Sequence, residues 1–200
     1  MTGMARATLR TLVCSAAIAV AVAAAPASAQ QTTAAAAAAV RGGPAEAPVQ
    51  LTLFCSLESA PCARLVIVLG RLLHERPQSV AVTFRHAAPP EHERSPRLYA
   101  VVLAAARQEK GWDALDTFFI NVDAPESITI ESLQTTLNLD PAAFAADLAD
   151  GAVATAAIEE DAAEAARLSV TTTPALFLNG RRIEDLDTYD TIAAAIARLK

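Results

Sequence analysis

Residues 170–180, V-T-T-T-P-A-L-F-L-N-G, decide how the C-terminal part of this chain folds. The apolar run Ala175–Leu178 is typical of a short buried strand. Asn179-Gly180 is the strongest short-range signal for a hairpin turn, so we expect Arg181–Ile183 to be the partner strand. Thr173-Pro174 stands directly before the first of these strands. The stretch therefore predicts a β-hairpin that begins just after a proline.

The middle of the chain opens with a strand, a helix and a second strand. Val49–Phe54 is a nearly continuous apolar run, which suits a strand buried on both faces. Ser59 to about Arg76 is predicted to be a helix, because it begins at a good N-cap serine, tolerates Pro61 in its first turn and stops at Pro77. Val80–Phe84 is the second strand. About 25 residues separate the two strands, which is enough for a right-handed crossover and a parallel pair.

Helical patterns fill the space between these strands and the hairpin, and Thr188–Leu199 is expected to form a closing amphipathic helix. The order is β-α-β, several helices, then β-β-α. We therefore predict an α/β protein with a thioredoxin fold, with a helical insertion of about residues 91–150 after the second strand. The intervening helices are expected at Ser95–Lys110, Trp112–Ile120, Ile130–Leu137, Ala142–Leu148 and Ala152–Leu168.

The N-terminal segment is typical of a secretory signal peptide. It combines a positive start containing Arg6 and Arg10 with an apolar stretch at 11–25 and the small-residue site Ala27-Ser28-Ala29. A retained membrane anchor is the alternative, but the apolar run is short for a span of about 20 residues. We expect residues 1–29 to be cleaved, which places the protein in the periplasm or outside the cell.

The remainder divides into a linker and one domain. Residues 30–48 are rich in Ala and Pro and are interpreted as a linker, because they offer little apolar bulk to a core. Residues 49–200 have the size of one ordinary domain. Removal of Arg6 and Arg10 takes the formal charge from −6 to −8. With no basic patch, we expect neither a nucleic-acid partner nor, after signal cleavage, a membrane partner.

Two cysteines remain after cleavage, Cys55 and Cys62, and an oxidising compartment favours their pairing. Cys62 falls at position N3 of the predicted helix, where free N–H groups and the helix dipole stabilise a thiolate. His74, His86 and His92 are scattered and are interpreted as surface or capping residues. We predict no metal site and no cofactor.

Three stretches resemble the DsbA-like thioredoxin family. Residues 54–64, F-C-S-L-E-S-A-P-C-A-R, are similar to the family's F-x-D-F-x-C-P-x-C-x-R. Residues 107–119 resemble its A-x-x-Q-G-K-F-W-x-x-H-D-x-L-F segment. Residues 166–180 resemble A-x-x-x-G-V-x-G-T-P-x-F-x-x-N-G, and this match is the most specific because cis-proline site, strand and turn follow in the family's order. The resemblance implies a cis peptide bond at Thr173-Pro174 that faces the start of the Ser59 helix.

The resemblance also shows what has changed. With Cys62 on the family's second cysteine, Ser59 takes the place of the attacking one, so the C-x-x-C pair is reduced to Ser59-Ala60-Pro61-Cys62. A serine hydroxyl forms no disulfide, and dithiol exchange through that pair is impossible. Ser56 replaces the family's acid, and Ser169 and Thr172 replace two glycines. The redox motif is therefore degenerate.

Whether Cys55 and Cys62 bond to each other stays open at this level. The six residues between them reverse the chain and bring the strand end near the helix start, but strand alternation could equally point Cys55 away. We favour a bond. It would be either a structural staple or a displaced redox pair, with Cys62 activated by the helix and Cys55 resolving.

Three functions fit these residues. The first is a thiol–disulfide oxidoreductase that uses Cys62, Ser59 and Cys55, and the second is a redox-inactive peptide-binding or chaperone-like module. A glutathione-binding protein, with the Ser59 hydroxyl orienting a thiol, ranks third. Backbone beside Thr173 and Pro174 could pair with an extended chain, so thiol-containing or unfolded polypeptides are the expected substrates.

Overall fold

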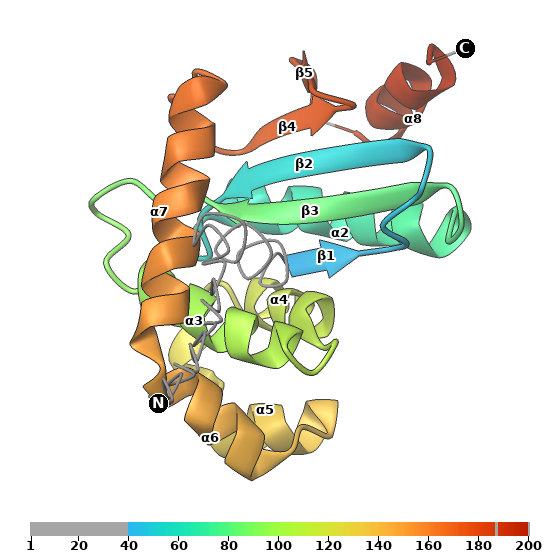
Figure 1. The fold of residues 1–200 in the computed structure, drawn as a ribbon. Helices are drawn as coiled ribbons and strands as arrows, with labels where there is room; N and C mark the ends of the chain where they lie inside the picture. The colour runs from blue at the N-terminus through green and yellow to red at the C-terminus, as the bar shows by residue number, and fades with distance from the viewer. Residues whose placement is uncertain (1–39, 187, 200) are drawn as a thin grey trace, which may run out of the picture.

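A five-stranded mixed sheet forms the centre of the protein (Figure 1). The computed structural model describes residues 40–186 and 188–199. In the sheet, β2 and β3 run parallel, as the crossover predicts, and the other neighbours are antiparallel. The strands, in spatial order, are β1 (Val40–Gly42), β3 (Val80–His86), β2 (Val49–Cys55), β4 (Ala175–Leu178) and β5 (Arg181–Ile183).

The helices follow the predicted order, and the structure has a thioredoxin fold with its extra helices between β3 and β4. The helix between the parallel strands is α2 (Ala60–Glu75), and the closing one is α8 (Tyr189–Ala197). Phe118 and Phe119 are buried and pack in the core among the inserted helices. These are α3 (Ser95–Ala106), α4 (Gly111–Ile120), a short 3-10 turn η1 (Pro125–Ser127), α5 (Ile130–Leu137), α6 (Pro141–Ala149) and α7 (Gly151–Arg167).

The two faces of the sheet bury different side chains. Leu51, Leu53 and Cys55 alternate along β2 and join the main core, which they share with α2. Phe54 points the other way, packs edge-on against Phe177 of β4 at 5.7 Å, and belongs to a smaller cluster that includes Ala165 of α7. In Figure 1, α2 accordingly lies behind the sheet while α7 crosses in front of it.

Residues 40–48 differ from the expected linker. Val40 is buried, and β1 pairs with β3 from Val40↔Phe84 to Gly42↔Val82, so the sheet begins inside the segment assigned to 30–48. The glycine explains why the pattern misled: a Cβ on Gly42 would lie 2.8 Å from the Trp112 ring, so only glycine fits this edge strand against α4. Residues 1–29, predicted as a signal peptide, lie outside the described residues.

Helix α3 ends at Ala106, earlier than the predicted Lys110. Glu109 adopts the left-handed conformation (φ 61°), and the Lys110 N–H donates to the Ala105 carbonyl in a helix-terminating turn. Helical spacing of apolar residues does not reveal such a turn when no glycine occupies it. Among the described residues no single helix has the length and apolarity to cross a membrane; α6 and α7 meet that test only when taken together, and they are bent by 63° at their junction.

Candidate functional site

The start of α2 has the predicted cap. Ser59 is extended (φ −104°, ψ 112°), and its Oγ accepts a hydrogen bond from the Cys62 N–H at 3.4 Å. Pro61 sits in the first turn, where its missing N–H costs nothing. Cys62 therefore lies at N3, as the sequence predicts, and Ser59 is 7% exposed.

Cys55 and Cys62 form a disulfide, with Cα atoms 5.8 Å apart. Cys55 ends β2 on the same face as Leu51 and Leu53, the face covered by α2, so strand alternation points it toward Cys62. Both cysteines are fully buried, with 0% exposure. Thiol–disulfide exchange requires a thiolate to reach a sulfur atom, and in this conformation solvent reaches neither.

The peptide bond between Thr173 and Pro174 is cis, as the resemblance implies. Strand pairing of Phe54 with Ala175 places this bond beside the end of β2, where the chain turns into α2. Ser59 and Thr173 line the same groove, so the cis-proline loop faces the start of α2. The structure thus brings together the two segments that the sequence singled out.

This groove has a volume of about 830 Å³ and lies between three segments. Its walls are residues 87–93 of the loop that follows β3, the side of α7 around Ala162 and Ala166, and the loop 171–173. The green loop after β3 projects next to α7 in Figure 1. Ser59 lines the groove although only 7% of it is exposed, whereas Cys62 does not line the groove. The site therefore presents a hydroxyl where the resemblance places a nucleophilic thiol.

Hydrogen bonds beneath the groove tie the β2–α2 loop to the start of α3. Ser95 Oγ accepts from the Leu57 N–H at 3.0 Å and lies 3.1 Å from Ser56 Oγ and 3.0 Å from His86 Nε2. His92 Nδ1 is 2.7 Å from Ser56 Oγ. In return, the Glu58 carboxylate accepts hydrogen bonds from the backbone N–H groups of Arg94 and Ser95, at 2.9 and 2.8 Å.

The interpretation of His86 as a surface or capping residue is wrong. Its side chain is 6% exposed, stacks on Tyr99 with ring centroids 5.2 Å apart, and is neutral because burial lowers its pKa to about 4. The sequence hides this because the apolar pattern ends the strand at Phe84, whereas β3 continues to His86. His92 is half-buried, and its ring forms a hydrogen bond with the Ser56 hydroxyl.

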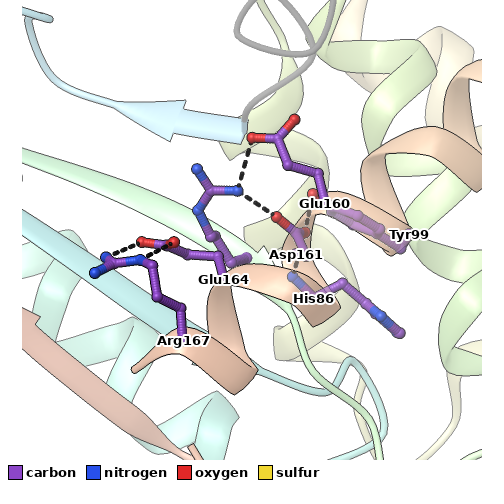
Figure 2. Close-up of polar contacts among 7 residues, drawn as sticks. His86, Tyr99, Glu160, Asp161, Glu164 and Arg167 are labelled. Carbon is purple, nitrogen blue, oxygen red and sulfur yellow. Dashed lines mark hydrogen bonds and ion pairs between the residues drawn. The ribbon is translucent and has the colours of Figure 1, made fainter. Parts of the chain in front are cut away.

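Asp161 of α7 joins a second buried group of polar residues (Figure 2). It accepts hydrogen bonds from the His86 N–H at 2.7 Å, the Tyr99 hydroxyl at 2.9 Å and the Arg85 guanidinium at 2.8 Å. Burial raises the pKa of this carboxyl, and the three donors oppose that rise. An acid within an Ala/Glu-rich helix looks like a surface residue in sequence, and only the packing of α7 on β3 shows its structural role.

A thioredoxin fold with a groove between a capped helix start and a cis-proline loop defines the class of this protein. A family model described as thioredoxin, Thioredoxin_4, matches residues 19–198, and the chain belongs to that family.

Solved structures of DsbA proteins share this fold. The thiol-disulfide exchange protein alpha-DsbA2 from Wolbachia pipientis superimposes with a TM-score of 0.68 at 15% identity, over 86% of this chain and 98% of that one. BdbD from Bacillus subtilis gives 0.67 at 16% identity over 80% and 92%, and Pseudomonas aeruginosa DsbA2 gives 0.64 at 22% over 80% and 93%. At these identities the likeness concerns the fold.

A curated relative is similar in sequence but much longer. The Na(+)/H(+) antiporter NhaA of Herminiimonas arsenicoxydans is 29% identical over 154 residues, which is 77% of this chain. The chain spans about a quarter (24%) of the length of that relative.

Proposed function

We propose that this chain is an exported DsbA-like member of the thiol–disulfide oxidoreductase family that binds extended polypeptides in its groove without exchanging thiols there. The proposal rests on one observation: the groove is open, while both sulfur atoms of the disulfide are buried. Ser59 borders the groove in place of a thiol, and the Cys55–Cys62 disulfide beneath it is fully buried. The bond then serves as a structural staple.

Peptide binding is supported by what the groove offers. Thr171, Thr172 and Thr173 line its edge, and β4 begins only at Ala175, after the cis proline, so these residues lie outside the strand ladder of the sheet. An extended chain can pair with such backbone, while apolar walls on α7 receive its side chains. Thiol-containing or unfolded polypeptides, which expose both backbone and apolar side chains, are the ligands we propose.

Export is the second part of the proposal. It rests on the leader pattern of residues 1–29 and on a disulfide that an oxidising compartment maintains. N-terminal sequencing of protein recovered outside the cytoplasm should begin near Gln30. A product that keeps residues 1–29 in a membrane fraction would contradict it.

One observation favours a second candidate, a slow thiol–disulfide oxidoreductase. Cys62 lies at N3 of α2, where the helix dipole stabilises a thiolate, and Cys55 is placed to act as the resolving cysteine. This candidate requires local opening to expose the sulfur atoms. An insulin-reduction assay separates the two: we expect no activity above background. Glutathione binding by calorimetry would identify the third possibility, a glutathione-binding protein.

The direct test of the groove uses a labelled, cysteine-free extended peptide and fluorescence anisotropy. Ala166→Trp fills the groove from an exposed position of α7 and should abolish binding. Ala163→Trp, on the same helix and also exposed but away from the groove, is the matched control and should bind as the wild type does. Equal loss, or no effect, in both variants would contradict the proposed site.

A further inference from the structure

We propose that the groove selects polypeptides in which basic side chains are interspersed with apolar ones. This inference rests on the proposed function, because it names the substrate class of the same groove. Its basis is the charge of the walls. Glu91 and Glu93 line one side, and among the described residues that border the groove there is no Lys or Arg.

The two carboxylates are available to a ligand. Neither Glu91 nor Glu93 has a hydrogen bond or ion pair with the described part of the chain, whereas nearby Glu58 is engaged by Arg94 through a 2.9 Å ion pair. His86, which also borders the groove, is neutral because burial lowers its pKa to about 4. The groove therefore carries negative charge on one wall.

The loop that presents these carboxylates is held in place. His92 binds Ser56 below the groove, and Glu58 fixes the backbone of Arg94 and Ser95 at the loop's end. Pro89 and Pro90 further restrict the backbone of the loop. A fixed loop keeps its charges at the groove edge. Because the loop is already ordered, less conformational entropy is lost when a ligand binds.

The opposite wall is apolar. Ile158, Ala162 and Ala166 of α7 face the groove, and Val170 follows them. Side chains of an extended peptide alternate between two directions, so one set can rest on α7 while the other reaches the carboxylates of the loop. Charge complementarity at one edge and apolar contact at the other select a polypeptide that carries both kinds of side chain.

Three labelled, cysteine-free peptides test this selection. They share an extended apolar sequence and differ only at two alternate positions, which carry Lys, Gln or Glu. For the oxidised protein at low ionic strength, we expect the Lys peptide to bind about tenfold more tightly than the Glu peptide, with the Gln peptide between them. The preference should shrink at high salt, since exposed charge pairs are screened.

Variants assign the effect to the loop. The double variant Glu91→Gln/Glu93→Gln should bind all three peptides with equal affinity and leave the Gln peptide unchanged. Glu46→Gln/Glu131→Gln, which removes two exposed carboxylates away from the groove, should keep the wild-type preference.

The outcomes separate this inference from the proposed function. If all three peptides bind the wild type equally, or if the loop variant keeps the preference, the charge selection is wrong while the peptide groove stands. If Ala166→Trp leaves the affinity for all three unchanged, or none binds the wild type, the proposed function itself is wrong.

Discussion

The two segments that meet at the groove have kept different parts of the family's site. The start of α2 keeps its cap and one cysteine, but Ser59 stands where the resemblance places the attacking thiol, and Cys62 forms a buried bond with Cys55. The loop before β4 keeps the cis bond at Thr173-Pro174. We infer from this difference that peptide docking and redox chemistry can separate on this fold, because docking needs a groove, whereas exchange needs an accessible sulfur atom.

The largest effect is expected when a thiol is introduced at position 59, because this should restore redox chemistry at the start of α2. Ser59→Cys combined with Cys55→Ala places a new thiol three positions before Cys62 and so forms a C-x-x-C pair at a helix start, a geometry that lowers thiol pKa and permits exchange. We expect the oxidation rate of a dithiol peptide to rise by roughly two orders of magnitude over the wild type. The measurement is oxidation of that peptide by the pre-oxidised proteins.

Cys55→Ala alone is the control, since it leaves a single thiol and should stop at a mixed disulfide. Equal oxidation rates in the double variant and the wild type would mean that Ser59 does not occupy the nucleophile's position.

Removal of the Cys55–Cys62 disulfide should lower the stability of the protein and leave the groove intact. For Cys55→Ala/Cys62→Ala, the loop-entropy model gives a loss of about 2.5 kcal/mol in the free energy of unfolding. Urea unfolding followed by circular dichroism measures it, with the reduced wild type as the comparison. Peptide binding should survive at low urea. A double variant as stable as the oxidised wild type would show that the bond does not act as a staple.

Low pH should lower the free energy of unfolding through protonation of His86. Its pKa in the folded state, about 4, lies below the value of 6.5 for a free histidine, so the stability it contributes is present above pH 6.5 and is lost as pH falls toward 4. Between pH 7.5 and 5 this loss is about 2 kcal/mol. Urea unfolding at both pH values should show a drop larger by that amount in the wild type than in His86→Gln.

The comparison with His86→Gln is needed because Asp116 acts in the opposite direction. Burial raises its pKa to about 6, so it adds stability as pH falls through 6. Identical pH dependence in the wild type and His86→Gln would contradict the neutral, buried histidine.

The smallest expected effect concerns the turn between α7 and the cis-proline loop. Ser169 ends α7 in the left-handed conformation (φ 55°), where the resemblance places a glycine, and the Val170 N–H closes the turn on the Ala165 carbonyl at 2.8 Å. Ser169→Gly should raise the unfolding free energy by about 0.5 kcal/mol, the relief of strain less the added chain entropy. Ser79→Gly, an exposed serine with ordinary φ, should instead lower it.

Much of this site could be predicted from the sequence, because its signals are local. Ser59 and Pro61 mark the helix start, and the order of Pro174, strand and Asn-Gly turn marks the hairpin. The buried polar groups could not be predicted. Asp161 and His86 occur in segments whose composition looks exposed, and their burial depends on α7 packing against β3, a contact between residues 75 positions apart in the chain.

The edge strand β1 was missed for a related reason. Gly42 and Gly43 look like linker residues, yet Gly42 is required by the approach of Trp112, which lies 70 residues further along the chain. Non-local packing of this kind leaves no periodic pattern in the sequence. Cys55 is intermediate: its side of the strand is set by alternation from Leu51 and Leu53, but which face α2 covers emerges only from the fold.

The most direct test of a groove that binds without exchanging thiols is one trapping experiment. The oxidised wild type is mixed with an equal amount of a reduced dithiol peptide at neutral pH, free thiols are alkylated, and the products are weighed by mass spectrometry. We expect the peptide to carry two alkyl groups and the protein to keep its Cys55–Cys62 bond. A peptide recovered as a disulfide, together with alkylated Cys55 and Cys62, would contradict the proposal and make this chain an oxidase.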